Sequence, residues 1–262
     1  MADEPTNEIS GESYSEDVPR IFAIRERDHR IHNPFTAEEL RTLGEVLRLK
    51  SGMTVLDLGS GSGEMLCTWA KDYGIAGVGV DLSKTFTEAA HARAAELNVA
   101  DSVRFVHADA AGYTTEPVDI AACVGATWIG GGVAGAITLL EESLEPGGTI
   151  LIGEPYWRKT PPSQEIIEDC EATRLDDFLG LPELLEQFGD REYDVVQMVL
   201  ANQDGWDRYM AAQWMSMREW LDENPDDEMA DEIREALKTE PARYARSTRE
   251  YVGWGVFALR KR

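Results

Sequence analysis

The chain has 262 residues, of which 49 are acidic and 25 are basic, so its formal net charge is −24. A charge this negative repels phosphate backbones and argues against binding to DNA or to nucleic acids in general. Hydrophobic residues make up 43% of the chain, enough for a folded core. No apolar run of about 18 residues occurs, which argues against a membrane-spanning helix. The first residues lack the basic and apolar segments of a secretory signal.

Cysteine and lysine are both scarce. The three cysteines show no CxxC spacing, so neither a disulfide framework nor a thiolate zinc site is indicated, and a reducing, cytoplasmic location is expected. Six Lys stand against nineteen Arg. An acidic, Lys-poor surface suits a saline cytoplasm, but a GC-rich genome would also favour Arg, so the composition leaves both explanations open.

The N-terminal part divides at residue 19. Residues 1–19 are acidic and contain little that is apolar, which predicts a mobile tail. A helix is predicted over 20–31, and a second helix after it has Thr36 as its N-cap with Glu39 three residues later, the spacing of a capping box.

Strands and helices then alternate at intervals of about 20–30 residues, which predicts βαβ units and a parallel sheet covered on both faces. Strands are predicted over 54–58, 76–81, 103–107, 118–124 and 149–153. Helices are predicted over 64–73, 84–97 and 133–144. Two later strands, over 193–201 and 252–260, flank a long helical insertion over 204–240.

The most informative stretch is VLDLGSGSGEML, residues 55–66, in which an apolar strand enters a glycine turn that opens a helix. Such a turn lets a ligand lie against the backbone, and the helix start offers N–H groups to an anionic group. The dinucleotide fingerprint GxGxxG does not fit, because its sixth position holds Glu64 or Leu66. A glycine triplet alone could also be a structural turn.

The stretch resembles motif I of the class I S-adenosylmethionine-dependent methyltransferases. The resemblance continues, in the right order, through GVGVDLS (77–83), FVHADA (105–110), VDIAACVGA (118–126) and LEPGGTILIGEP (144–155). It implies an α/β, Rossmann-like mixed sheet of seven strands, order 3-2-1-4-5-7-6, with strand seven antiparallel, helices on both faces and a helical insertion before the last strand. It also implies a single domain with an N-terminal tail and helical lid (1–50), a cofactor-binding core (51–155) and a C-terminal part of the same sheet (156–262).

The resemblance further implies S-adenosylmethionine as cofactor and S-adenosylhomocysteine as product. Asp57 would lie near the methionine ammonium, Asp81 would accept the ribose hydroxyls, and Asp109 would accept from the adenine amino group. Asp81 could instead be a helix N-cap. The expected cofactor-binding residues, near the carboxyl ends of strands where open α/β sheets bind ligands, are Asp57, Gly59, Ser60, Gly61, Gly63, Asp81, Leu82, Asp109, Ala110, Val124 and Gly125.

The acceptor is expected to be a small molecule, methylated at O, N or C by in-line displacement. The [DN]PP[YF] motif of amino-methylating nucleic-acid and protein enzymes is replaced by Val-Gly-Ala-Thr at 124–127. The candidate substrate-binding residues are four aromatic side chains in the segments after the predicted strands: Trp128, Tyr156, Trp157 and Trp206. Trp128 could also be a core residue, and Trp206 begins an apolar stripe of the helical insertion that could instead pack on the sheet or on a second subunit.

Candidate bases are few. His32, three residues after His29, and Glu154, after the fifth strand, are the candidate catalytic residues, with a surface role for His32 and an ion pair between Glu154 and Arg158 as the alternatives. No metal-binding motif is present. Residues 10–35 are predicted either to close as a lid over bound cofactor or to dock permanently on the sheet.

Two other functions remain open from the sequence. The same fold and cofactor could serve a methyltransferase acting on RNA or protein, or a non-catalytic protein that binds S-adenosylmethionine. A homodimer also remains open, and no membrane partner is expected.

Overall fold

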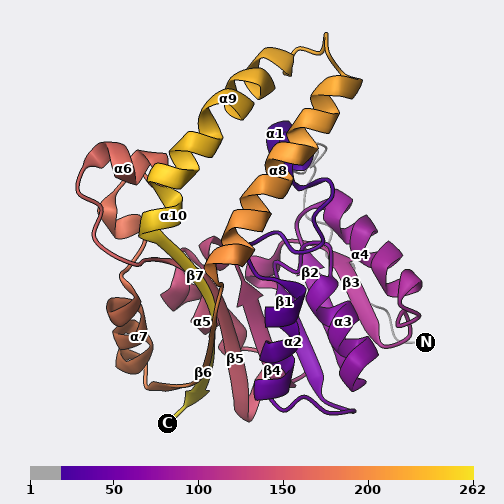
Figure 1. Ribbon diagram of the computed structural model, residues 1–262. Coiled ribbons are helices and arrows are strands. Elements are labelled where there is room, and N and C mark those ends of the chain that lie inside the picture. Colours follow the sequence, from indigo (N-terminus) through magenta and orange to yellow (C-terminus); the bar gives the residue numbers. More distant parts are fainter. Residues whose placement is uncertain (1–18) are drawn as a thin grey trace.

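The computed structural model describes residues 19–262, and one seven-stranded sheet runs through it (Figure 1). The strand order is β3-β2-β1-β4-β5-β7-β6. β7 pairs antiparallel with both β5 and β6, whereas the other neighbours are parallel. The strands are β1 (Thr54–Leu58), β2 (Ala76–Asp81), β3 (Val103–His107), β4 (Val118–Val124), β5 (Leu144–Trp157), β6 (Tyr193–Leu200) and β7 (Val252–Lys261). The topology that the resemblance implied is confirmed. The predicted tail lies outside the described residues except for Pro19.

Helices cover both faces of the sheet. They are α1 (Arg20–Glu26), α2 (Ala37–Val46), α3 (Glu64–Tyr73), α4 (Lys84–Glu96), α5 (Val133–Glu141), α6 (Gln164–Asp169), α7 (Leu181–Asp190), α8 (Gln203–Glu223), α9 (Ala230–Arg246) and α10 (Thr248–Tyr251). Short 3₁₀ turns lie at Ala110–Gly112, Thr127–Gly130 and Leu175–Asp177. One apolar core joins α2, α3 and α4 to the sheet, and a second joins α5 and α7 to the opposite face. The apolar side chains of the sheet therefore leave water on both sides, as a largely parallel sheet requires.

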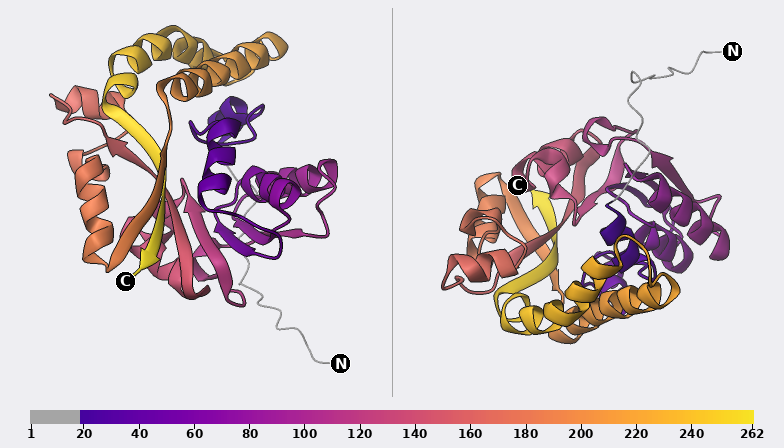
Figure 2. Two further views of the ribbon diagram at one scale, coloured as in Figure 1. Left: turned by 60° about the horizontal axis from the view of Figure 1, so that its bottom comes forward. Right: turned by 90° about the horizontal axis from the view of Figure 1, so that it is seen from above.

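A helical hairpin, α8 and α9, lies over the carboxyl ends of the parallel strands (Figures 1 and 2). α1 packs beside α8, and a third apolar cluster joins these helices. Its buried members are Ile24, Met217, Leu221, Ala230 and Ile233. The hairpin also joins the first sheet core through Trp206 and Tyr244. We call α1 and the hairpin the roof, because they lie above the edge of the sheet where ligands bind.

The predicted capping box at the start of α2 is confirmed and has an additional role. Thr36 Oγ1 accepts from Glu39 N at 3.1 Å, and Glu39 Oε2 accepts from Thr36 N at 2.8 Å. The other oxygen of the buried Glu39 carboxylate accepts from Asn202 N and Nδ2, each at 2.8 Å. One side chain therefore fixes the starts of both α2 and α8.

Several predicted boundaries are wrong. The helix predicted over 20–31 ends at Glu26, and the chain turns there because the carboxylate of Glu26 is buried against α8. β5 begins at Leu144 rather than 149, because Leu144 pairs with Val118 before the register shifts along β4.

The predicted insertion over 204–240 is two helices, α8 and α9, separated by a link that contains Pro225. A proline disfavours the helical conformation of the residue before it, so α8 ends there. In the acidic link between the two helices, Asp227 pairs with Arg20, the first residue of α1, at 2.6 Å.

None of the described helices combines enough length with enough apolar character to cross a membrane.

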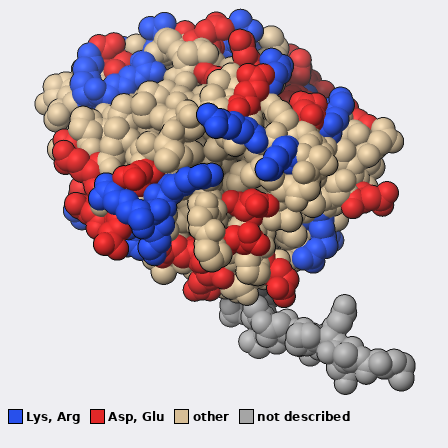
Figure 3. Space-filling model, turned by 90° about the horizontal axis from the view of Figure 1, so that it is seen from below, with Lys and Arg blue, Asp and Glu red and all other residues tan. Residues whose placement is uncertain are grey.

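On the face seen in Figure 3, at the amino ends of the parallel strands, blue basic and red acidic side chains are interspersed.

Candidate active site

The glycine loop connects β1 to α3 with backbone conformations that need glycine. Gly63 has φ +74°, and an added Cβ would lie 2.5 Å from the ring of Phe105. The loop is held against the neighbouring strand because Gly59 N and Ser60 N both donate to Val80 O, at 2.8 and 3.0 Å. Packing also explains Gly59, where an added Cβ would lie 2.5 Å from Ala126 Cβ, and Gly59 and Gly61 in addition line a cavity.

Asp81 supports this loop from the end of β2. Its Oδ2 accepts from Gly61 N at 2.7 Å and its Oδ1 from Ser83 N at 2.9 Å. Ser83, and not Asp81, is the N-cap of α4, since Ser83 Oγ accepts from Phe86 N. The alternative role for Asp81 as the helix cap is thus taken by its neighbour.

Asp57 is buried below the loop at the end of β1. Its Oδ1 accepts no hydrogen bond from any of the residues 19–262. Burial, with the nearby Asp81 carboxylate as a second cause, raises the pKa of Asp57 to about 7. A buried acidic oxygen without a partner is costly. A cationic group of a ligand in the cavity above would compensate for it.

A cavity of about 400 Å³ lies over the carboxyl ends of β1, β2 and β4. Eight of the eleven predicted cofactor residues line it: Asp57, Gly59, Ser60, Gly61, Asp81, Leu82, Val124 and Gly125. Gly63, Asp109 and Ala110 are not among the lining residues. Asp109 is exposed, and its Oδ1 accepts from Ala111 N at 2.9 Å at the start of a 3₁₀ turn. The assignment of Asp109 and Ala110 to the adenine stays a prediction.

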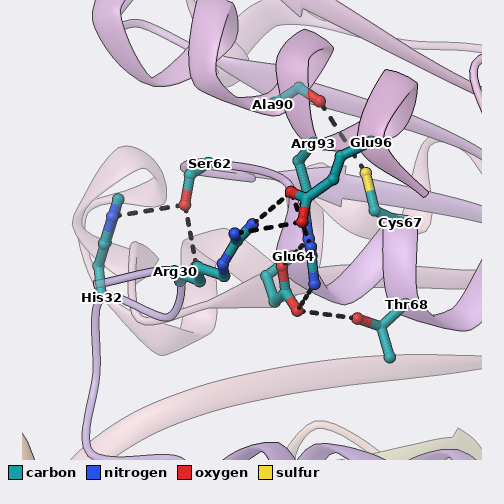
Figure 4. Close-up of polar contacts among 9 residues, drawn as sticks. All are labelled: Arg30, His32, Ser62, Glu64, Cys67, Thr68, Ala90, Arg93 and Glu96. Atoms are coloured by element: carbon teal, nitrogen blue, oxygen red, sulfur yellow. Dashed lines mark hydrogen bonds and ion pairs between the residues drawn. The ribbon is translucent and has the colours of Figure 1, made fainter. Parts of the chain in front are cut away.

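The N-terminal segment closes one side of this cavity (Figure 4). Ser62 Oγ donates to Arg30 O at 2.9 Å and lies 3.4 Å from His32 Nε2. The His32 ring also packs on Phe86, with centroids 4.3 Å apart. Burial lowers the pKa of His32, so its imidazole is neutral at physiological pH.

Charged side chains hold this segment to the two helices beside the loop (Figure 4). Arg30 pairs with Glu96 at 3.0 Å, Arg93 pairs with Glu96 at 2.9 Å, and Arg93 pairs with Glu64 at 2.6 Å. The chain of ion pairs fixes the wall that carries His32. It places one of the two predicted catalytic residues in the cavity.

The second predicted base, Glu154, is not among the residues that line this cavity. Its Oε2 accepts from Thr127 Oγ1 at 2.7 Å, and burial raises its pKa to about 7 against the lowering effect of that bond. The alternative ion pair is not formed, because Arg158 donates instead to Gln203 Oε1 at 2.8 Å.

The four predicted aromatic substrate residues are not brought together. Trp128 lines the cavity and is 69% exposed, so it is a rim residue and not a core residue. Tyr156 and Trp157 are buried, and Trp157 donates to Leu175 O at 2.8 Å. Trp206 lines a second cavity of about 320 Å³ beneath the helical hairpin.

Sequence reasoning missed several lining residues, notably Phe86 and Asn33. Phe86 lies in the first turn of α4, four residues after Leu82 and five after Asp81. Its place shortly after two expected cofactor-binding residues could have suggested it. Asn33 has no such signal, because its place depends on the turn after α1. Among residues 19–262, no cluster of three or more His, Cys, Asp or Glu is arranged to hold a metal, and all three cysteines are free and buried.

The site fits S-adenosylmethionine on two observations of this structure. The unpartnered Oδ1 of buried Asp57 can meet an ammonium group, and the glycine loop leaves open backbone where side chains would intrude. At Gly61, with φ +52°, an added Cβ would lie 3.2 Å from His32 Nδ1 and narrow the cavity.

Comparisons with known proteins agree with this site. A family model described as a methyltransferase domain matches residues 55–148. A Geobacter sulfurreducens SAM-dependent methyltransferase, solved in complex with S-adenosyl-L-homocysteine, is 64% identical, with 94% of this chain and 99% of that chain covered and a TM-score of 0.92. A Thiobacillus denitrificans SAM-dependent methyltransferase, solved with the same compound, is also 64% identical, with coverages of 94% and 100% and a TM-score of 0.92.

A third relative, YjhP of Escherichia coli (strain K12), is 60% identical over 93% of this chain and 98% of its own. Identity at this level over nearly the whole length, together with the glycine loop and its two acids, shows that the chain belongs to the S-adenosylmethionine-dependent methyltransferases.

Proposed function

We propose that this methyltransferase acts on a small-molecule acceptor inside a covered compartment. The observation that carries the proposal is the roof: α1 and the α8–α9 hairpin lie over the carboxyl edge of the sheet, and two cavities of about 400 and 320 Å³ lie beneath it. Such volumes are typical of sites for small ligands. The net charge of −24 disfavours an RNA acceptor.

The residues of the first cavity have distinct tasks. S-adenosylmethionine, when bound, supplies the methyl group. Asp81 holds the glycine loop in shape and offers its carboxylate to ligand hydroxyls, while Asp57 offers negative charge below the loop. Phe22 and the His32 segment exclude water from the same space.

Methyl transfer by in-line displacement depends mainly on alignment and the exclusion of water, so no residue is obligatory as a catalyst. A base is needed if the acceptor must lose a proton. His32 is a suitable candidate because it borders the cavity and its lowered pKa keeps the imidazole neutral. Glu154 is a weaker candidate for the base because it does not line the first cavity.

The test incubates the full chain with methyl-labelled S-adenosylmethionine and a bacterial extract separated into metabolite, RNA and protein fractions. We expect label in the metabolite fraction, and less label with the cofactor-site variant Asp81→Ala when the cofactor concentration is low. Label confined to RNA or protein would refute the small-molecule acceptor. Tight cofactor binding with no label in any fraction would favour a binding protein without transferase activity.

A further inference from the structure

The second cavity is built from the roof and the adjacent edge of the sheet. Segments from α1, α8, α9 and the region after β5 all contribute to its wall. Phe22 lines both this cavity and the cofactor cavity, so the two spaces adjoin at this side chain. The second cavity thus has the position of an acceptor compartment, if the proposed methyl transfer to a small molecule is correct.

The charges around the second cavity do not balance. Arg25 pairs with the buried Glu240, and Arg243 lies 3.7 Å from Glu240 and 3.4 Å from Glu171. Both arginines that line the cavity therefore already have carboxylate partners. The remaining lining carboxylate, that of Glu26, has no arginine partner, and the basic group beside it is the imidazole of His29, which does not line the cavity.

Glu26 is 3% exposed, and its two carboxylate oxygens differ in their hydrogen bonds. Its Oε1 accepts from Tyr209 OH at 2.8 Å and from Gln213 Nε2 at 2.6 Å. Its Oε2 accepts no hydrogen bond from the part of the chain that the structure describes, and His29 Nδ1, 3.0 Å away, forms an ion pair with it only when the imidazole is protonated. A buried carboxylate that lacks an aligned donor is costly, and a ligand with N–H donors would satisfy it.

Aromatic side chains form much of the remaining wall. Trp206 and Tyr209 come from α8, Tyr244 from α9, and Phe178 from the region after β5. Aromatic faces attract cations as well as apolar groups, which adds to the effect of the carboxylate. A cavity with an excess carboxylate and aromatic walls favours an amine over an alcohol or an acid.

We propose that the second cavity binds the acceptor through a protonated amine, whose N–H groups donate to Glu26 and whose apolar body packs on the aromatic walls. The proposal rests on the proposed small-molecule methyltransferase function. It adds the chemical class of the acceptor, a small organic amine, and names Glu26 as a binding residue for it.

The test uses three phenyl probes of similar size, 2-phenylethylamine, 2-phenylethanol and phenylacetate, titrated by calorimetry into the full chain saturated with S-adenosylhomocysteine. We expect the amine to bind about tenfold more tightly than the alcohol, and phenylacetate to bind least. In Glu26→Gln the amine should lose this advantage. Met210→Trp, which fills the cavity from α8, should abolish binding of all three probes.

The matched control is Glu235→Gln, which removes an exposed carboxylate of α9 and should leave the probe affinities unchanged. Affinity for S-adenosylhomocysteine, measured in each variant, shows that the fold and the first cavity are intact. Equal binding of amine and alcohol, an unchanged amine preference in Glu26→Gln, or no binding of any probe would overturn the proposal. Failure of the proposed function has a different signature, since it would appear as missing label in the metabolite fraction and does not depend on Glu26.

Discussion

Asp57 and Asp81 end neighbouring strands, but their surroundings differ. Asp81 accepts two backbone hydrogen bonds, whereas Asp57 is buried with one oxygen unpartnered. Charge on Asp57 is therefore disfavoured until a cation binds, and its pKa is raised to about 7. The two acids should respond differently to pH and to substitution.

We expect the affinity for S-adenosylhomocysteine to rise from pH 6 to pH 8, because Asp57 must be ionised to attract the ligand ammonium and its pKa is about 7. Asp57→Asn should bind more weakly and with little pH dependence in this range. Titration calorimetry in buffers of matched ionic strength measures both. A wild-type profile that persists in Asp57→Asn would assign the pH dependence to another group.

The same group affects stability in the ligand-free protein. Its pKa is raised from 3.8 to about 7, so the folded chain keeps a proton that the unfolded chain has released. This contribution lowers the free energy of unfolding as pH rises through that window. Urea unfolding should show Asp57→Asn gaining stability relative to wild type between pH 5 and pH 7. A constant difference between the two proteins would contradict the raised pKa.

For Asp81→Ala we expect the dissociation constant for S-adenosylhomocysteine to increase about tenfold or more, because charge-assisted bonds to ligand hydroxyls and the support of Gly61 are both lost. Asp81→Asn keeps an acceptor oxygen and should lose less. Calorimetry gives the affinities, and the melting temperature checks the fold. An unchanged dissociation constant with normal melting would restrict Asp81 to shaping the loop.

At the scale of elements, α1 and the start of α2 connect the roof to the cofactor site. α1 packs on the hairpin through Ile24, and the segment after it is tied to the glycine loop through Ser62. The structure thus shows a docked N-terminal segment, and Phe22 and His32 from this part of the chain line the first cavity. Docking and ligand-dependent closure are both compatible with these contacts.

We expect S-adenosylhomocysteine to slow hydrogen exchange of backbone amides in residues 20–35, because a bound ligand adds contacts to a segment that forms one wall of its cavity. Exchange detected by mass spectrometry, with and without ligand, measures the effect, and α5 on the opposite face is the internal control. Strong protection without ligand that the ligand does not change would support permanent docking and exclude a lid.

The capping box gives a prediction for stability. Thr36→Ala removes the side chain that caps α2 and should lower the free energy of unfolding by about 1 kcal/mol. Glu39→Ala should cost more, because Asn202 N and Nδ2 lose their acceptor as well. Chemical denaturation measures both variants. Equal losses would show that the link to α8 adds nothing to the cap.

At the scale of the whole molecule, the net charge of −24 is the dominant property. Ion pairs such as Arg25 with Glu240 are local, and they leave a large excess of like charge on one folded chain. Such an excess destabilises the compact state by self-repulsion, and salt screens it.

We therefore expect the melting temperature to rise as sodium chloride increases from about 0.05 M to about 0.5 M. The rise should be smaller near pH 5, where the net charge is closer to zero because the sequence isoelectric point is about 4.5. Differential scanning calorimetry at the two pH values tests this. A melting temperature that is independent of salt at pH 7 would show that repulsion is already balanced within the fold.

The residue patterns by themselves predicted the alternation of strands and helices, whereas the strand order and the cofactor were implied by the resemblance of the sequence motifs to a family, and eight of the eleven expected cofactor residues line the first cavity. The signals were local: apolar strands, glycines that need positive φ, and acids at strand ends, and their order along the chain follows the order of the βαβ units. The capping box at Thr36 was equally local, since its two partners are three residues apart.

Only the tertiary structure decided which side chains of the roof face a cavity. Glu26, Tyr209 and Gln213 meet because α1 docks on α8, although about 180 residues separate them along the chain. The stripe of α8 did not show that Trp206 borders a cavity while Met217 is buried in the roof. An amphipathic pattern gives the face that leaves water, and the packing of the neighbouring helices decides whether that face meets apolar atoms or an open space.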